Sequence, residues 1–476
     1  MESTIVDALM TKTKPKDLLH GLRQYRSGWA DGPAYITQCP IRSKQTYTYR
    51  FKVEDQRGTL LWHAHHSWQR ASVYGAFIIY PRKPYPFSGS HIQSEIPIIL
   101  DTFTANVDAG KTYILRVINA ALNNELFFAV SNHTLTVVEV DAVYTKPVHT
   151  KAIMIAPGQT TTLLLRTNNH LTDGEFLIAA TPYVTSVFPF NNSTTVGFLR
   201  YNNNDKSKPV VNHLNNNRRR LTTTLSTHAV LPDMLDTKFA TRFSDSIKSL
   251  GTEEYPCRVP TAIDKRVVTT ISLNLQDCPE NHHCEGYNGK RFFASMNNVS
   301  FIRPPISVLE SYYKKQSKGV FTLDFPEKPP KRFDFTGVNP VSENMNTEFG
   351  TKLFEVEFGA RLEIVFQGTS FLNVENHPLH VHGHNFFVVG RGFGNFDEEK
   401  DPAKYNLVDP PERNTVAVPT GGWAAIRINA DNPGVWFIHC HLEQHTSWGL
   451  AMGFIVKDGP LPSQTLLRPP RDLPKC

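Results

Sequence analysis

Histidines gathered in four short segments are the residues of this 476-residue chain most able to do chemistry. Nine of its 19 histidines lie in these segments. In chain order they are His20, then His63 and His65, then His377, His380 and His382, and finally His439, His441 and His445. Imidazole nitrogens are common ligands of copper, zinc, iron and nickel. The grouping therefore predicts metal sites.

Three histidine pairs occupy alternate positions of segments that are expected to be strands. The pairs are His63 with His65, His380 with His382, and His439 with His441. Since side chains alternate across a strand, each pair shares one face. Cys440 lies between the last two histidines, so its side chain points to the opposite face. One tripeptide, residues 439–441, can therefore serve two different metal centres.

The ligand types favour copper at one of these centres. A thiolate with two imidazoles in a trigonal arrangement is the ligand set of a blue copper electron-transfer site, which has a weak axial position. Cys440, His445 and His377 supply these three donors. Leu450 lies ten residues beyond Cys440 and cannot coordinate a metal. If Leu450 occupies the axial position, its apolar side chain favours Cu(I) and raises the reduction potential.

Two other interpretations of the histidines were weighed. A single His-x-His on a strand is more often exposed or hydrogen-bonded in a core than metal-bound. Zinc also binds histidine and cysteine, but a zinc site would leave too many of these imidazoles unused. Four groups together, with a cysteine between two histidines, favour copper over both alternatives.

Length and composition predict what must position these residues. A chain of 476 residues exceeds one hydrophobic core, so two or three domains are expected. The 33 prolines, 28 glycines and many short runs of β-branched and aromatic residues favour brief strands joined by turns, hence an all-β fold. The net charge of +6 is mild, and the triplet Arg218 to Arg220 reads as a solvated loop rather than a nucleic-acid site. No run of about 18 apolar residues is present, so no membrane span is predicted.

Strand-like runs divide the chain into three β-units of one general build. The predicted divisions are a first domain at 1–88, a second at 92–201, an interdomain connection without chemistry at 202–255, and a third domain at 256–476. In the first, residues 45–53 alternate like a half-buried strand and residues 75–80 resemble a buried one. Further strands are predicted at 114–119, 135–140, 161–166, 175–180, 196–201, 267–275, 353–358, 361–366, 385–390, 423–429 and 435–440.

Cysteines and sequons point to an extracellular protein. Cys278 and Cys284 are close enough for a local disulfide, while Cys39 and Cys476 can join the two ends, which leaves Cys257 unpaired. Glycosylation sequons begin at Asn132, Asn191, Asn192 and Asn298. The first twenty residues lack the features of a secretory signal.

The metal-binding segments and their surroundings resemble those of multicopper oxidases, and of plant laccases in particular. RGTLLWHAHHSWQRASVYG, ENHPLHVHGHNFFVVGRGFGNF and the C-terminal DLPKC carry this resemblance, which extends from about Leu19 to Cys476. It implies three cupredoxin-like Greek-key β-barrel domains and up to four copper ions. A type 1 copper is expected in the last domain and a trinuclear cluster between the first and the last.

The resemblance also implies a role for each ligand. The type 1 ligands are His377, Cys440 and His445; the type 3 ligands are His20, His63, His65, His382, His439 and His441; His380 binds the type 2 copper. Asp31 and Glu443 are implied as carboxylates beside the cluster that relay protons. The alternative is that Asp31 holds a turn and Glu443 is a solvated helix residue.

Three departures from the family pattern are evident. Leu18 stands where the family has the other type 2 histidine, the first in a His-Trp-His-Gly segment. Only about seventeen residues precede the first copper segment, so the first barrel is expected to be incomplete. The second domain is expected to lack its opening strands, because residues 96–100 pass directly into residues 101–113. Open strand edges are expected in both domains.

The implied function is that of a secreted apoplastic laccase, a monomeric glycoprotein active on lignin-related phenols. Such an enzyme oxidises phenols by one electron and reduces O₂ to water. A catalytically impaired copper-binding protein with a defective type 2 site, caused by Leu18, is the main alternative; it would be blue without consuming oxygen. Ascorbate oxidase shares the copper motifs, but Leu450 argues against it. An inert remnant would take up no metal.

Overall fold

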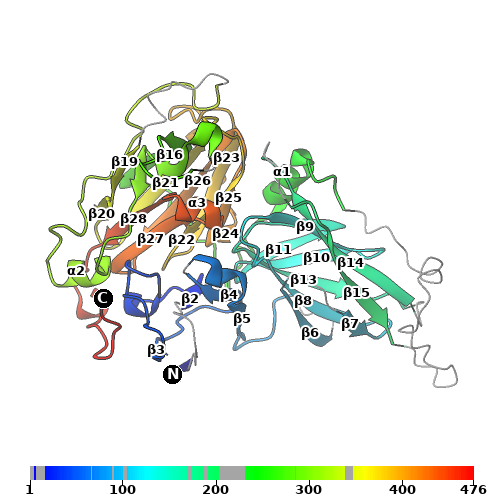
Figure 1. Cartoon of the computed structure of the whole chain (residues 1–476). Coiled ribbons are helices and arrows are strands. Elements are labelled where there is room, and N and C mark those ends of the chain that lie inside the picture. The colour runs from blue at the N-terminus through cyan, green and yellow to red at the C-terminus, as the bar shows by residue number, and fades with distance from the viewer. Residues whose placement is uncertain are drawn as a thin grey trace.

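Strands dominate the part of the chain that the structure describes, which confirms the predicted all-β class (Figure 1). The computed structural model describes residues 5–6, 17–65, 67–87, 91–99, 104–169, 174–186, 191–202, 231–284, 286–337 and 347–476. Two β-bodies lie side by side in Figure 1, and the short strands of the first unit lie between them at their lower edge. No helix of these residues is long and apolar enough to cross a membrane.

The third unit packs an eight-stranded sheet against a five-stranded one. The larger sheet has the order β19-β18-β17-β16-β21-β26-β23-β24 and the smaller β20-β28-β27-β22-β25. The larger sheet contains β16 (Lys265–Gln276), β17 (Arg291–Met296), β18 (Val299–Phe301), β19 (Glu348–Gly350), β21 (Ala360–Gly368), β23 (Phe386–Phe393), β24 (Glu412–Arg413) and β26 (Gly422–Ala430). The smaller contains β20 (Leu353–Val356), β22 (His377–Val381), β25 (Thr415–Val418), β27 (Gly434–Cys440) and β28 (Ala451–Val456).

Apolar side chains from both sheets of the third unit form its core. Ile364 and Ile426 of the larger sheet and Ile438 and Phe454 of the smaller belong to one fully buried cluster. Cys440 is part of this cluster. Close packing of this kind holds the strands that carry the third unit's histidines in fixed positions.

The second unit is a sandwich of two five-stranded sheets. Their orders are β11-β10-β13-β8-β6 and β12-β9-β14-β15-β7. The first contains β6 (Ile92–Ile99), β8 (Thr112–Ile118), β10 (Leu135–Val140), β11 (Val143–Thr150) and β13 (Thr160–Arg166). The second contains β7 (Thr104–Val107), β9 (Glu125–Val130), β12 (Ala152–Ile155), β14 (Gly174–Tyr183) and β15 (Thr195–Tyr201).

Strands β6 and β7 differ from the expectation that the second domain begins without its opening strands. β6 pairs in parallel with β8, and β7 pairs in parallel with β15. Each therefore adds an outer strand to one sheet of the sandwich.

The first unit is smaller. Its sheet has the order β2-β4-β5 and consists of β2 (Asp17–His20), β4 (Gly58–Ala64) and β5 (Tyr74–Ile79), while β1 (Ile5–Val6) pairs with β3 (Tyr49–Arg50). The strand predicted at 45–53 is only two residues long, although Tyr47, Tyr49 and Phe51 are buried as the alternation requires. Among the described residues only β1 pairs with this strand, β3, so the β-ladder between them is short. β5 is a strand as predicted, but all six of its residues are only half-buried.

A helix lies within the segment that was predicted to be only a connection. Helix α1 (Thr237–Ser246) begins after Asp236, whose side chain accepts a hydrogen bond from the Phe239 amide. Ala240 and Phe243 pack into the core of the second unit. The sparse apolar residues of this helix obscured its periodicity in the sequence. The described residues also form the α-helices α2 (Val308–Tyr313) and α3 (Glu443–Ser447).

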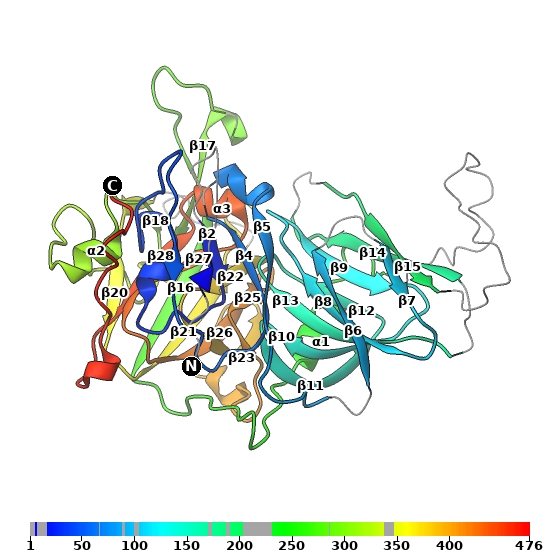
Figure 2. The same cartoon turned by 90° about the horizontal axis from the view of Figure 1, so that it is seen from below.

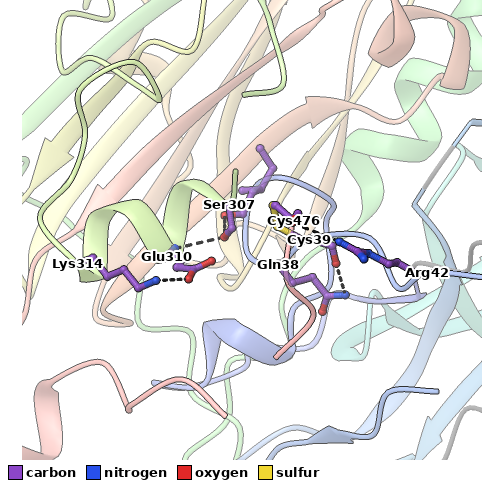
Figure 3. Close-up of a disulfide and its surroundings, with 8 residues drawn as sticks. Gln38, Cys39, Arg42, Ser307, Glu310, Lys314 and Cys476 are labelled. Atoms are coloured by element: carbon purple, nitrogen blue, oxygen red, sulfur yellow. Dashed lines mark hydrogen bonds and ion pairs between the residues drawn. A yellow bond between two sulfur atoms is a disulfide. The ribbon is translucent and has the colours of Figure 1, made fainter. Parts of the chain in front are cut away.

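Both predicted disulfides are present. Cys278 bonds to Cys284, Cys39 bonds to Cys476 across 437 positions, and Cys257 is free. Figure 3 shows the long-range disulfide beside the start of α2, where Ser307 caps the helix by accepting from the Glu310 amide. This disulfide joins the first unit to the C-terminal tail.

Candidate metal centre

Two neighbouring strands of the third unit, with the residue directly after each, hold six of the ten candidate ligands. β22 pairs antiparallel with β27, so that Leu379 lies opposite Cys440 and His380 opposite His439. β25 lies along the other side of β22. The first unit contributes β2 and β4, which pair antiparallel with Leu18 opposite His63. Figure 2 shows these first-unit strands against the end of the third unit.

Nine of the ten predicted metal-binding side chains meet in three buried groups. The groups are His20 with His63 and His441, His65 with His382 and His439, and His377 with Cys440 and His445. In each, the ligand atoms lie within 4.8 Å of one another. His439 and His441 face the first two groups, whereas Cys440 faces the third, as strand alternation predicts.

Spacing within the histidine groups suits a shared metal ion. Nε2 of His441 lies 3.3 Å from Nε2 of His63, and Nε2 of His65 lies 3.4 Å from Nε2 of His439. Two imidazole nitrogens about 2.0 Å from one tetrahedral metal ion are separated by about 3.3 Å. Each pair can therefore be bridged by an ion with little rearrangement.

Hydrogen bonds on the far side of the rings fix which nitrogen faces the group. Nδ1 of His63 donates to the Ala64 carbonyl at 2.9 Å, and Nδ1 of His439 donates to the Cys440 carbonyl at 2.8 Å. Nδ1 of His382 lies 2.9 Å from the Asp31 carboxylate. A ring that donates through Nδ1 keeps its Nε2 lone pair for a metal.

Within the two three-histidine groups, two buried ring nitrogens have no hydrogen-bond partner among the described residues. They are Nε2 of His382 and Nδ1 of His20. The other nitrogen of His20 contacts the Thr415 hydroxyl at 3.0 Å. Unsatisfied buried polar atoms are uncommon, and here each belongs to a different three-histidine group. Both groups therefore fit a metal ion.

Burial keeps most of these imidazoles neutral. It lowers the pKa of His63 to about 3 and that of His377 to about 3, and it lowers the pKa of His65 and His439 well below the ordinary value. Neutral imidazole is the form that binds a metal.

The third group has the geometry of a thiolate site. Sγ of Cys440 lies 3.7 Å from Nδ1 of His445 and 4.0 Å from Nδ1 of His377. Leu450 is fully buried, its amide donates to the His445 carbonyl, and its carbonyl accepts from the Cys440 amide. The backbone of this apolar residue is therefore hydrogen-bonded to two of the three members of the group.

Comparisons with known proteins agree with this geometry. Three family descriptions, each of a multicopper oxidase, match residues 18–84, 80–204 and 324–460. Laccase-1 of Arabidopsis thaliana is 79% identical over 500 residues, with 96% of this chain and 85% of that protein covered. The chain belongs to the multicopper oxidase family. It is a laccase-type oxidoreductase with copper as its cofactor.

More distant relatives share the fold of this multicopper oxidase. Laccase-4 of Oryza sativa subsp. japonica is 48% identical over 96% of this chain and 85% of its own length. The crystal structure of Fet3p, a multicopper oxidase that functions in iron import, superposes with a TM-score of 0.68 at 22% identity, over 98% of this chain and 86% of that one. The laccase from Botrytis aclada gives 0.65 at 22% identity, over 98% and 81%.

The alignment with Laccase-1 also bears on internal length. It runs over 500 positions, yet it includes only 96% of the 476 residues of this chain. Some aligned positions of the relative therefore have no counterpart here, as expected if the oxidase lacks an internal stretch.

His380 belongs to none of the three groups. Its ring stacks on that of His20 with centroids 3.6 Å apart, and its Nδ1 donates to the Asn414 carbonyl at 2.8 Å. It therefore lies beside the two three-histidine groups of the oxidase, with Nε2 left for a metal. Leu18, the predicted replacement for a second type 2 ligand, has its backbone in β2, while its side chain lies outside the described part of the structure.

Both predicted carboxylates lie at the centre. Asp31 is buried and bonds directly to His382. Glu443 is partly buried and contacts Arg70 at 3.1 Å, and burial raises the pKa of its carboxyl group. Neither residue is only a turn or surface residue of the oxidase.

The rings of His377 and His445 are both buried. Their exposed fractions are 2% and 4%. Glu375, which lies two residues before His377, accepts a hydrogen bond from Nε2 of His445 at 3.0 Å and is itself partly exposed. Burial alone raises the pKa of Glu375, but attraction to His445 outweighs burial and the net pKa is lowered. Glu375 thus covers the ring edge on the solvent side.

Sequence reasoning missed three other residues that contact the ligands. Nη2 of Arg70 donates to the carbonyl of His441 and lies 2.9 Å from its Nδ1, and Thr415 contacts His20. Gly158, with a φ of +84°, approaches so closely that a Cβ there would lie 2.7 Å from His20. Of these three residues, only Arg70 could have been suspected from the sequence, since it follows His65 by five residues in the same segment.

Proposed function

We propose that this enzyme oxidises phenols, including lignin-related ones, by one electron each and reduces O₂ to water with four such electrons. The observation that carries this proposal is the division of residues 439–441 between two kinds of metal group. Bound copper would supply the electron-transfer and oxygen chemistry that protein side chains lack.

The ligand roles follow from the three groups. His377, Cys440 and His445 would hold type 1 copper, and the two three-histidine groups would each hold one type 3 copper. His380 would bind the type 2 copper. Asp31, through Nδ1 of His382, and the Cys440 carbonyl, through Nδ1 of His439, orient two of the ligands.

The route between the centres is short. The peptide on either side of Cys440 leads directly to His439 and His441. A second connection is the hydrogen bond from His439 to the Cys440 carbonyl. Both connections lie at the buried end of strand β27, so the fold fixes their lengths.

Carboxyl groups near the proposed ligands would accept and deliver protons. Glu375 is the group through which a phenol can approach His445, and its carboxylate would accept the phenolic proton as the phenol loses an electron. Glu443, whose pKa is raised, would deliver protons toward the cluster with Asp31.

Copper-loaded enzyme tests the proposal. We expect thiolate-to-copper absorption and oxygen uptake that depends on an added phenol. Cys440→Ser should remove both, while Cys257→Ser, which alters the free cysteine outside the groups, should remove neither. Unchanged colour in Cys440→Ser would contradict the ligand assignment.

A copper protein with an impaired type 2 site is the second candidate. It is favoured by Leu18, whose alkyl side chain cannot bind copper, and by the absence of His380 from the described three-residue groups. Leu18→His should then raise the rate of oxygen consumption at least about 100-fold (~3 kcal/mol) without changing the blue absorption. Equal rates in both proteins would reject this candidate.

The enzyme's domains and location complete the proposal. We assign the three domains to residues 1–88, 92–201 and 256–476. The connection is assigned to residues 202–255, and it includes helix α1. A monomer secreted to the apoplast is supported by the two disulfides, which suit an oxidising compartment. The sequon residues Asn132, Asn191 and Asn192 are exposed, and glycan release followed by mass measurement would test their use.

A further inference from the structure

A cavity of about 250 Å³ lies between the second and third units, apart from the metal centre. α1 and the segment after it form one wall, and β23 and β25 form the other. Part of its lining is apolar and comes from Met154, Phe243, Ile247, Val388, Val416 and Ala417, while polar groups form the larger part. It is larger than a small inorganic ion requires.

Four cationic side chains and one carboxylate also line this cavity. They are Lys248, Arg391, Lys404, Arg413 and Asp245. Arg413 is paired with Asp141 at 3.0 Å, and Lys404 with Asp401 at 2.9 Å. Lys248 and Arg391 remain as the positive charges that a ligand can meet.

Arg391 is the least satisfied of these cations. Its nearest carboxylate, that of Asp245, is 4.0 Å away, beyond hydrogen-bond distance. Its Nε is buried and has no hydrogen-bond partner among the described residues. A guanidinium can only donate, and its planar N–H groups match the two oxygens of a carboxylate. The unpaired Nε–H of Arg391 therefore indicates an anionic partner.

The cavity and the type 1 group are on different strands. Val416 and Ala417 of β25 line the cavity, whereas His377 lies on β22, paired opposite Val418. Gln159, another lining residue, is tied to β25 by a hydrogen bond to the Thr415 carbonyl. A molecule in the cavity would contact β25 without touching the copper ligands.

We propose that this cavity binds a small aromatic carboxylate, with its ring against Phe243 and Ile247 and its carboxylate on Arg391 and Lys248. The apolar part of the lining would contact the organic body of the ligand, and the two cations would select its charge. No chemical step is assigned to the bound molecule, which would be held and released unchanged. The proposal does not depend on phenol oxidation.

Benzoate is a suitable probe because it has no phenolic hydroxyl. Calorimetric titration of the copper-loaded full chain should show saturable benzoate binding, and uncharged benzyl alcohol should bind at least ten-fold more weakly. Arg391→Gln and Lys248→Gln should each weaken benzoate binding at least ten-fold. Lys314→Gln, on α2, is the matched control and should bind like the unaltered protein.

Three results would overturn the proposal. Equal benzoate affinity in Lys248→Gln and Arg391→Gln would place the ligand elsewhere. Sulfate competing as strongly as benzoate would show an anion site without selection for an aromatic body, and equal binding of benzyl alcohol would remove the role of charge. If Arg391→Gln does not fold, Lys248→Gln decides alone, because Lys248 is half-exposed at the cavity wall.

Discussion

Asp31 fixes the orientation of His382, which we propose as a copper ligand, since its carboxylate accepts from Nδ1 of His382. A neutral amide is a weaker acceptor, and removing such a partner commonly lowers metal affinity about 10- to 100-fold. We therefore expect Asp31→Asn to lose copper from the cluster in this range, measured as copper content after dialysis against a chelator. Asp264→Asn, at an exposed ion pair with Arg361, should retain its copper. Equal retention in both variants would show that Asp31 does not orient His382.

Glu125 gives a pH dependence that can be tested at one residue. Burial raises the pKa of its carboxyl group from 4.5 to about 7. The folded protein therefore holds this proton more tightly than the unfolded chain, so the stabilisation is complete below pH 4.5 and is lost as the pH rises through about 7. The loss corresponds to about 3 kcal/mol.

Glu125→Gln should remove this component. We expect the free energy of unfolding to fall less between pH 5 and pH 8 in this variant than in the unaltered protein, measured by urea denaturation at both pH values. The control is Glu175→Gln, at a more exposed carboxylate that pairs with Arg200. A pH dependence identical in all three proteins would be the contrary result.

Local spacing predicted the ligands but not their supports. The tripeptide at residues 439–441 predicts that its two histidines face one side of a strand and its cysteine the other. The structure divides the three residues between the metal-binding groups as that alternation requires. Thr415 contacts His20 across 395 positions, and Arg70 contacts His441 across 371. No local pattern encodes contacts of that range, because they arise only when the units pack together.

At the scale of the element, the capping of α1 can be tested separately. The Asp236 side chain accepts from the Phe239 amide at 2.8 Å, and loss of such a cap costs about 1 kcal/mol. Asp236→Ala should lower the urea midpoint accordingly, whereas Asp236→Asn should keep the cap and the midpoint. If the Asn variant is destabilised as much as the Ala variant, the cap is not the cause.

Strands with strong apolar patterns were predicted well, and those that depend on partners were not. Residues 135–140 form β10 as predicted, because their β-branched residues pack in the second core. Residues 45–53 alternate correctly but form little ladder, since a strand needs a neighbour as well as a pattern. Helix α1 was missed because only two of its residues are buried.

At the scale of the whole molecule, the Cys39–Cys476 disulfide joins segments 437 positions apart. Removing a disulfide commonly costs about 2–5 kcal/mol, and more for longer loops. Cys476→Ser should therefore lower the first thermal transition more than Cys278→Ser, whose loop spans six positions. Calorimetry of both variants provides the comparison, and a larger effect of Cys278→Ser would contradict this reasoning.

The division into three β-units could be predicted from the spacing of strand and turn patterns along the sequence. The arrangement of the units in space could not. Strand spacing reports only local pairing. The approach of Gly158 to His20 and His441 places a turn of the second unit against groups built by the other two. Only the complete packing reveals that all three units meet there.

Each three-histidine group takes ligands from both the first and the third unit. A metal ion bound in either group would therefore also crosslink the first unit to the third. The first unit has a small core of its own, so its docking and its metallation should be mutually dependent. Maturation of this enzyme would then be limited by copper supply as much as by folding, and copper starvation would leave the first unit accessible to proteases.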